Sequence, residues 1–210
     1  MSADRVLQVF ARAPVLGRVK TRLGHEIGTA AALHWYRILL HRTLLTASLV
    51  SEQVEIWCPS QDDPIELEQM VHGLNVTFHE QCSGDLGARM EFALKAGLKR
   101  ASKALLIGAD CPVWTAETLG ASVQALSTAS MVLIPADDGG YVGIGASDHV
   151  PPVFEGVSWG SSSVSSQTRR LMRAAGVNWA ELPSLWDVDR SADLDRWLRV
   201  EPNLPRPIVS

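Results

Sequence analysis

Short apolar runs alternate with longer helical patterns along most of the chain. Apolar runs typical of buried strands occupy residues 5–11, 53–58, 76–79, 104–107, 131–134 and 141–144, and a further extended piece occupies 177–182. Helical patterns occupy 28–50, 66–71, 85–101, 162–175 and 193–200, and Thr115 is placed to cap one more helix. This alternation predicts a single-domain α/β fold of three layers, α/β/α, with a mostly parallel sheet covered on both faces. The domain is expected to span residues 1–200, followed by a Pro-rich C-terminal tail at 201–210.

The composition is ordinary for a globular protein. The 210 residues are 46% hydrophobic and carry a formal net charge of −4, which argues against general binding of nucleic acid because that needs a broad basic surface. Cys58, Cys82 and Cys111 form neither a disulfide framework nor a Cys-x-x-Cys metal site. The first strand pattern begins without the apolar core of a signal peptide, and no apolar run reaches the roughly 20 residues that span a bilayer. We therefore expect a cytoplasmic protein with no membrane span.

A basic stretch directly follows the first predicted strand. Its cations are Arg12, Arg18, Lys20 and Arg22, and Gly17 shapes the turn between them. Ligands of open α/β sheets bind beyond the carboxyl ends of the strands, and Arg and Lys both suit phosphate oxygens. The stretch therefore predicts a phosphate-binding loop, and the alternative is a solvated basic loop.

A second candidate follows the buried run that ends at Ile107. Asp110 comes directly after this strand, and Pro112 restrains the backbone before it. The carboxylate would lie at the functional edge of the sheet, where the alternative is a cap for the next helix. Cys111 has no adjacent His or Lys to lower its pKa, so we expect an inert buried thiol.

Two adjacent acids and two glycines, Asp137 to Gly140, separate two predicted strands. This pattern is typical of the tip of a hairpin. Because adjacent side chains diverge, one of Asp137 and Asp138 could face a metal or an acceptor while the other braces the loop. The glycines would let the backbone approach a ligand closely.

Two further motifs carry acids near helix starts. Asp187 and Asp189 lie on one side of an extended segment and could share a divalent cation with a third carboxylate; the alternative is helix capping by Asp189 or Ser191. The segment that contains Asp85 and Arg89 opens a helix and predicts either a plain N-cap or an anion site.

Five motifs together resemble one protein family. They are residues 10–23, 84–90, 107–112, 135–141 and 187–189, in order over roughly residues 5 to 195. The family is a bacterial group of transferases with a glycosyltransferase-A-like fold, named from its association with radical-SAM and selenodomain proteins. The resemblance implies a nucleotide-diphospho-sugar transferase fold with a mixed, mainly parallel sheet whose first half binds the nucleotide.

Individual motifs are similar to those of neighbouring families. Residues 20–23 are similar to the Lys-Ser-Arg-Leu element of phospholactate guanylyltransferases, and the acidic ending at 187–194 is similar to that of molybdopterin cytidylyltransferases. Asp110 matches the position that commonly binds the divalent cation in the superfamily. Two positions depart from the pattern: Arg12 replaces a frequent Lys, and Arg190 replaces the usual Thr of the acidic ending.

The resemblance implies a transferase dependent on Mg²⁺ or Mn²⁺, with a nucleotide-diphospho-sugar donor and an acceptor of undefined class. The expected metal ligands are Asp110, Asp187 and Asp189, and the expected catalytic residues are Asp137, Asp138 and Lys20. The expected contacts to the nucleotide are Arg12, Gly17, Arg18, Lys20, Arg22, Asp85 and Arg89. One alternative is a nucleotidyltransferase that couples a nucleoside triphosphate to a small phosphorylated acceptor and releases pyrophosphate. The other is a non-catalytic nucleotide-binding module.

Overall fold

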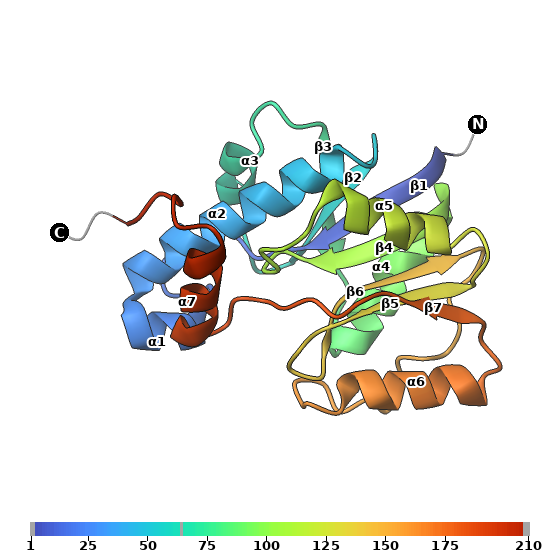
Figure 1. Cartoon of the computed structure of the whole chain (residues 1–210). Coiled ribbons are helices and arrows are strands. Elements are labelled where there is room, and N and C mark those ends of the chain that lie inside the picture. The colour runs from blue at the N-terminus through green and yellow to red at the C-terminus, as the bar shows by residue number, and fades with distance from the viewer. Residues whose placement is uncertain (1–2, 64, 208–210) are drawn as a thin grey trace.

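A seven-stranded sheet runs through the centre of the computed structural model, which describes residues 3–63 and 65–207 (Figure 1). The strands are β1 (Ala3–Phe10), β2 (Val54–Pro59), β3 (Val76–Gln81), β4 (Ala101–Gly108), β5 (Met131–Pro135), β6 (Tyr141–Ser147) and β7 (Trp179–Glu181). Their order in the sheet is β3-β2-β1-β4-β6-β5-β7, and β6 alone runs antiparallel to its neighbours. The reversal follows from the short 136–140 connection, because only an antiparallel pair can be joined by so tight a turn. The mixed, mainly parallel sheet confirms the predicted fold class.

Helices cover both faces of this sheet. They are α1 (Thr21–Ile27), α2 (Thr29–Ser48), α3 (Ile65–Met70), α4 (Leu86–Leu98), α5 (Ala116–Ala125), α6 (Val164–Ala174) and α7 (Ser191–Val200). Figure 1 shows α2 and α5 on one face and α4 and α6 on the other. Leu105 packs in the core beneath α2 and α5, and its neighbour Leu106 packs in the core beneath α4 and α6. Because successive strand side chains alternate between faces, both must be apolar, which explains the continuous apolar runs of the sequence.

A third apolar cluster joins the two ends of the chain. Leu23 of α1, Trp35 of α2 and Trp197 of α7 meet there with Trp186 and Val188. The cluster holds residues 186–189 beside the end of β4, where the Val188 N–H donates to the carbonyl oxygen of Asp110 at 3.0 Å. Packing among these apolar residues therefore brings the acidic ending at residues 187–189 to the edge of the sheet.

Two of the predicted helix caps are present in the structure. Thr115 caps α5, and Asp85 caps α4 by accepting the Ala88 N–H at 2.9 Å, as predicted. The alternative for Asp189 or Ser191, capping of the last helix, is wrong: Asp193 in its first turn accepts the N–H groups of the residues at 189 and 190. None of the helices within the described residues has the length and apolarity needed to cross a bilayer. Residues 208–210 of the predicted tail, and residues 1, 2 and 64 of the predicted domain, lie outside the described part.

The basic stretch is only partly a loop. Residues 21–27 form α1, which ends at Gly28 with φ of 88°, directly before α2 begins. Lys20 precedes α1 in the left-handed region, with φ of 46°. The helix escaped prediction because it is short, contains Gly24 and starts at a residue whose backbone conformation is rare for a side chain other than glycine.

Candidate active site

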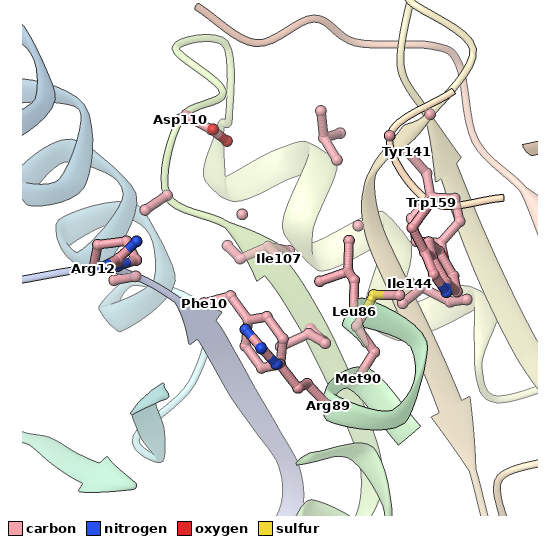
Figure 2. Close-up of a pocket in the computed structure, with 18 of the residues that line it drawn as sticks. Phe10, Arg12, Leu86, Arg89, Met90, Ile107, Asp110, Tyr141, Ile144 and Trp159 are labelled. Carbon is pink, nitrogen blue, oxygen red and sulfur yellow. The ribbon is translucent and has the colours of Figure 1, made fainter. Parts of the chain in front are cut away.

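A cavity of about 500 Å³ opens at the carboxyl ends of β1 and β4. Figure 2 shows its two unlike ends, with Arg12 and Asp110 at one and Tyr141 and Trp159 at the other. A second hollow of about 370 Å³ shares Arg12, Arg22, Tyr36 and Asp110 with it, and so continues the charged end. The second hollow is lined by Arg12, Arg18, Val19, Lys20, Thr21, Arg22, Tyr36, Asp110 and Asp189.

Arg12 at the start of the basic stretch is held by a buried carboxylate. Its guanidinium donates to both oxygens of Asp62, at 2.8 and 3.0 Å, and Asp62 also accepts the Ala13 N–H at 2.9 Å. The Asp62 side chain is only 2% exposed. Burial alone would raise the pKa of Asp62, but the hydrogen bonds from Arg12 and Ala13 hold it below its usual value. Tyr36 completes the anchor, because its hydroxyl pairs with both the N–H and the carbonyl oxygen of Arg12.

Lys20 and Asp110 form an ion pair at the centre of the charged end. The Lys20 ammonium lies 2.8 Å from the Asp110 carboxylate, and the Lys20 side chain is 7% exposed. The left-handed backbone of Lys20 turns the chain at this point, and such strain concentrates at functional sites. The predicted basic turn and the acid after β4, which lie 90 residues apart in sequence, thus meet in one place.

Two further carboxylates, those of Asp187 and Asp138, lie near this pair. The pKa of Asp187 is raised to about 6, first by burial and then by the charge of Asp110, with a smaller effect from Asp138; Lys20 opposes the rise. The described residues contain no group of three or more acids, histidines or cysteines already arranged as a metal shell. Two mutually repelling carboxylates nevertheless fit Mg²⁺ or Mn²⁺, since such ions take one or two carboxylates and complete their shell with phosphate oxygens and water.

The remaining predicted metal ligand points to a cation of the protein. Asp189 pairs with the exposed Arg22 at 2.8 Å, and Arg22 lines both hollows. The pair connects the acidic ending to the basic helix α1. Asp189 therefore orients Arg22 in this structure.

The turn between β5 and β6 separates its two acids, as the sequence suggested. Asp138 lines the cavity and accepts the Gly140 N–H at 2.8 Å. Asp137 instead pairs with Arg196 of α7 at 2.8 Å. The close backbone approach predicted for the glycines is to the protein itself, because a Cβ on Gly139 would overlap the backbone of Ser162.

Other predicted residues have distinct places. Arg89 lines the cavity, whereas Asp85 only caps its helix and Gly17 forms the turn of the basic stretch with φ of 75°. Cys111 is buried, and burial raises the pKa of its thiol to about 12, in agreement with the inert thiol predicted for it. Sequence reasoning missed Asp62 and Tyr36, whose only signal was a carboxylate within a turn-rich segment and one Tyr within an apolar helix.

The chain is similar to several solved structures. It matches a protein from Desulfovibrio desulfuricans G20, provisionally described as a nucleotide-diphospho-sugar transferase, with a TM-score of 0.89 and 30% identity over 96% of this chain and 89% of that chain. It also matches 4-diphosphocytidyl-2C-methyl-D-erythritol synthase from Anaerococcus prevotii DSM 20548, with a TM-score of 0.63 and 12% identity over 96% and 99% of the two chains. A third match is Rv0371c of Mycobacterium tuberculosis H37Rv in complex with manganese, with a TM-score of 0.53 and 18% identity over 95% and 100%. The last two matches show likeness of fold alone.

The chain is a transferase with the nucleotide-diphospho-sugar transferase fold. A family model described as "Uncharacterized protein conserved in bacteria (DUF2064)" matches residues 43–161, which is more than half of the chain. The chain belongs to this family. No curated protein matches it in sequence.

Proposed function

We propose that this protein is a metal-dependent glycosyltransferase that uses a nucleotide-diphospho-sugar donor. One observation carries the proposal: a single cavity joins a cationic end to an end without cations, and the Asp138 carboxylate lines it. Within the described lining of the 500 Å³ cavity the cationic side chains are Arg12, Arg22 and Arg89, and Figure 2 shows Arg12 and Arg89 away from Tyr141 and Trp159. Such an end suits a neutral acceptor rather than a phosphorylated one.

The charged end would bind the diphosphate of the donor. Arg18, Lys20 and Arg22 surround the hollow that continues the cavity, and each can contact phosphate oxygens. Negative charge builds up on the leaving nucleoside diphosphate as its bond to the sugar breaks. Fixed cations aimed at that charge stabilise the transition state more than the ground state. Arg12 and Arg89 line the same cavity and are proposed as further contacts to the nucleotide.

Asp110 and Asp187 would hold the divalent cation. When bound, Mg²⁺ or Mn²⁺ would neutralise diphosphate oxygens and act as a Lewis acid on the leaving group. The repulsion that raises the pKa of Asp187 would be relieved by a cation between the two carboxylates. The description of Rv0371c as a complex with manganese supports a metal in a protein of this fold.

Asp138 would act on the acceptor. Its carboxylate lines the cavity, and the Gly140 N–H fixes its orientation. It can accept the proton of an acceptor hydroxyl as that oxygen bonds to the sugar carbon. The bond between the sugar and the diphosphate breaks, and the nucleoside diphosphate leaves.

A second candidate, nucleotidyl transfer, is favoured by the density of positive charge in the basic stretch. Four cations line the 370 Å³ hollow, which suits the larger charge of a triphosphate. The match to a diphosphocytidyl synthase supports the same candidate, at the level of the fold. The acceptor would then need a phosphate, which the end without cations does not favour.

The two candidates release different products. Purified protein with Mn²⁺ should release nucleoside diphosphate from at least one member of a panel of UDP-, GDP-, ADP- and dTDP-sugars, and Asp110→Asn should abolish the release. Pyrophosphate release from nucleoside triphosphates, with no activity on nucleotide sugars, would refute glycosyl transfer and establish the second candidate. Silence in both assays, without a thermal shift by any nucleotide, would refute both.

A further inference from the structure

The aromatic end of the cavity has no part in the phosphate chemistry. It is lined by Leu86, Met90, Tyr141, Ile144, Trp159 and Val164, from α4, β6, α6 and the connection that precedes α6. Figure 2 shows Tyr141 and Trp159 together on the side opposite Arg12. A sugar or polyol would need several polar side chains to pair its hydroxyl groups, and this end supplies mainly apolar surface.

Trp159 is held in place as a wall of this end. Gly87 in the first turn of α4 lies against its indole, because a Cβ there would come within 2.6 Å of the ring and 2.8 Å of the Phe154 carbonyl oxygen. The Tyr141 ring meets the indole edge to face, with centroids 6.3 Å apart and planes at 88°. Gly87, within the motif at residues 84–90, thus positions an aromatic surface.

The connection that carries Trp159 is itself fixed. The Ser158 N–H donates to the Gln167 side chain at 2.9 Å, and the Ser161 hydroxyl donates to the Ser158 carbonyl oxygen at 2.7 Å. A preformed wall loses little conformational entropy when a ligand binds. The indole therefore forms a fixed part of the cavity wall.

Leu86 is a second apolar residue that marks this end of the cavity as a binding surface. It stands at the start of α4 and lines the cavity, yet 43% of its surface is exposed, whereas Met90 one turn further is buried. An exposed apolar side chain beside an aromatic wall is favourable to cover, since burial of apolar area lowers the free energy by about 25 cal/mol per Å².

We propose that this end binds an apolar ring of the acceptor, so that the acceptor is an aromatic or alicyclic alcohol whose hydroxyl group lies at Asp138. The assignment as an acceptor site rests on the proposed function. The apolar recognition does not, because it depends on Trp159, Leu86 and their supports alone. Sugars, polyols and phosphorylated acceptors are poor ligands for this end.

The test uses 2-naphthylmethanol as the probe and the full chain as the protein. Binding is measured by ligand-observed saturation-transfer NMR and by titration. Trp159→Ala and Leu86→Asn should each weaken binding roughly 3- to 10-fold, the range expected for loss of one aromatic or apolar contact. Phe92→Ala is the matched control, because Phe92 is an exposed aromatic residue of α4 that packs on Trp57 outside the cavity. Leu86→Asn keeps the test decisive if Trp159→Ala does not fold.

Equal binding of the probe by wild type, Trp159→Ala and Leu86→Asn would overturn the inference, as would preferred binding of myo-inositol at the same site. Binding of nucleotide sugars with Mn²⁺ is measured on the same samples. Loss of nucleotide-sugar binding with probe binding intact would refute the proposed function and support the apolar site. The reverse result would refute the apolar site alone.

Discussion

Replacement of Asp187 by asparagine should stabilise the metal-free protein at neutral pH. The pKa of Asp187 is raised from 3.8 to about 6, chiefly by burial and by Asp110, so the folded state disfavours the ionised form. This penalty is fully present above about pH 6 and disappears as the pH falls below 3.8, where both folded and unfolded states bind the proton. An asparagine side chain carries no charge, so the variant should gain stability at pH 7 and nothing near pH 3.8.

The size of the gain follows from the shift. Two pKa units correspond to roughly 3 kcal/mol, and partial exposure to solvent reduces this to about 1–2 kcal/mol. For a chain of this length the melting temperature should rise by about 3–6 °C. Mn²⁺ should reverse the order, because wild type gains the cation between Asp110 and Asp187 and the variant loses one ligand.

The assay is thermal unfolding of wild type and Asp187→Asn in EDTA and in Mn²⁺, at pH 7 and pH 4. Asp195→Asn, an exposed acid of α7, serves as the control and should track wild type throughout. A variant that melts below wild type in EDTA at pH 7, or that keeps the full stabilisation by Mn²⁺, would refute the reasoning.

Three further changes test the site. Asp62→Asn should lower the free energy of unfolding by about 2 kcal/mol at pH 7, as expected for hydrogen bonds to a charged group. Because the pKa of Asp62 is lowered in the folded state, this loss should shrink as the pH falls below 3.8 in acid-unfolding curves. A loss that stays constant with pH would contradict this prediction. Lys20→Met should weaken nucleotide binding at least tenfold. In the absence of nucleotide the same variant should bind Mn²⁺ more tightly, because the Lys20 ammonium of the wild type competes with the metal for Asp110. Weaker Mn²⁺ binding by the variant in a titration would refute this. Gly139→Ala should lower the melting temperature more than Gly156→Ala, because both have positive φ but only position 139 meets backbone; equal effects would argue against the packing.

The sequence predicted the sheet well because the strands are buried on both faces. β4 and β5 contain continuous apolar runs, whereas β1 and β2 each carry one buried polar residue, Gln8 and Glu55. The turns between elements carry Gly, Pro or paired acids. The antiparallel β6 could also be anticipated from the hairpin signal at residues 137–140. The short helix α1 could not, since seven residues after a left-handed Lys20 carry too little periodicity.

The candidate site could be predicted in part from the sequence for a similar reason. The basic stretch and Asp110 each follow a parallel strand, so both must lie at the same edge of the sheet, and the sequence alone predicts that they are near each other. The partner of Arg12 could not be predicted from the sequence, because Asp62 lies 50 residues away and its neighbouring residues are those of an ordinary turn. The pairing of Asp137 with Arg196 is likewise a long-range contact that local pattern does not encode.

In the proposed mechanism a divalent cation and the donor's diphosphate are bound together between the Asp110–Asp187 pair and the cations of the basic stretch. The most direct measurement is the affinity for a nucleoside diphosphate with and without Mn²⁺, in wild type and Asp110→Asn. If the cation and the diphosphate bind together, Mn²⁺ should increase the affinity for the nucleotide at least tenfold in wild type and have almost no effect on it in the variant. Equal affinity in EDTA and in Mn²⁺ for wild type would contradict this mechanism.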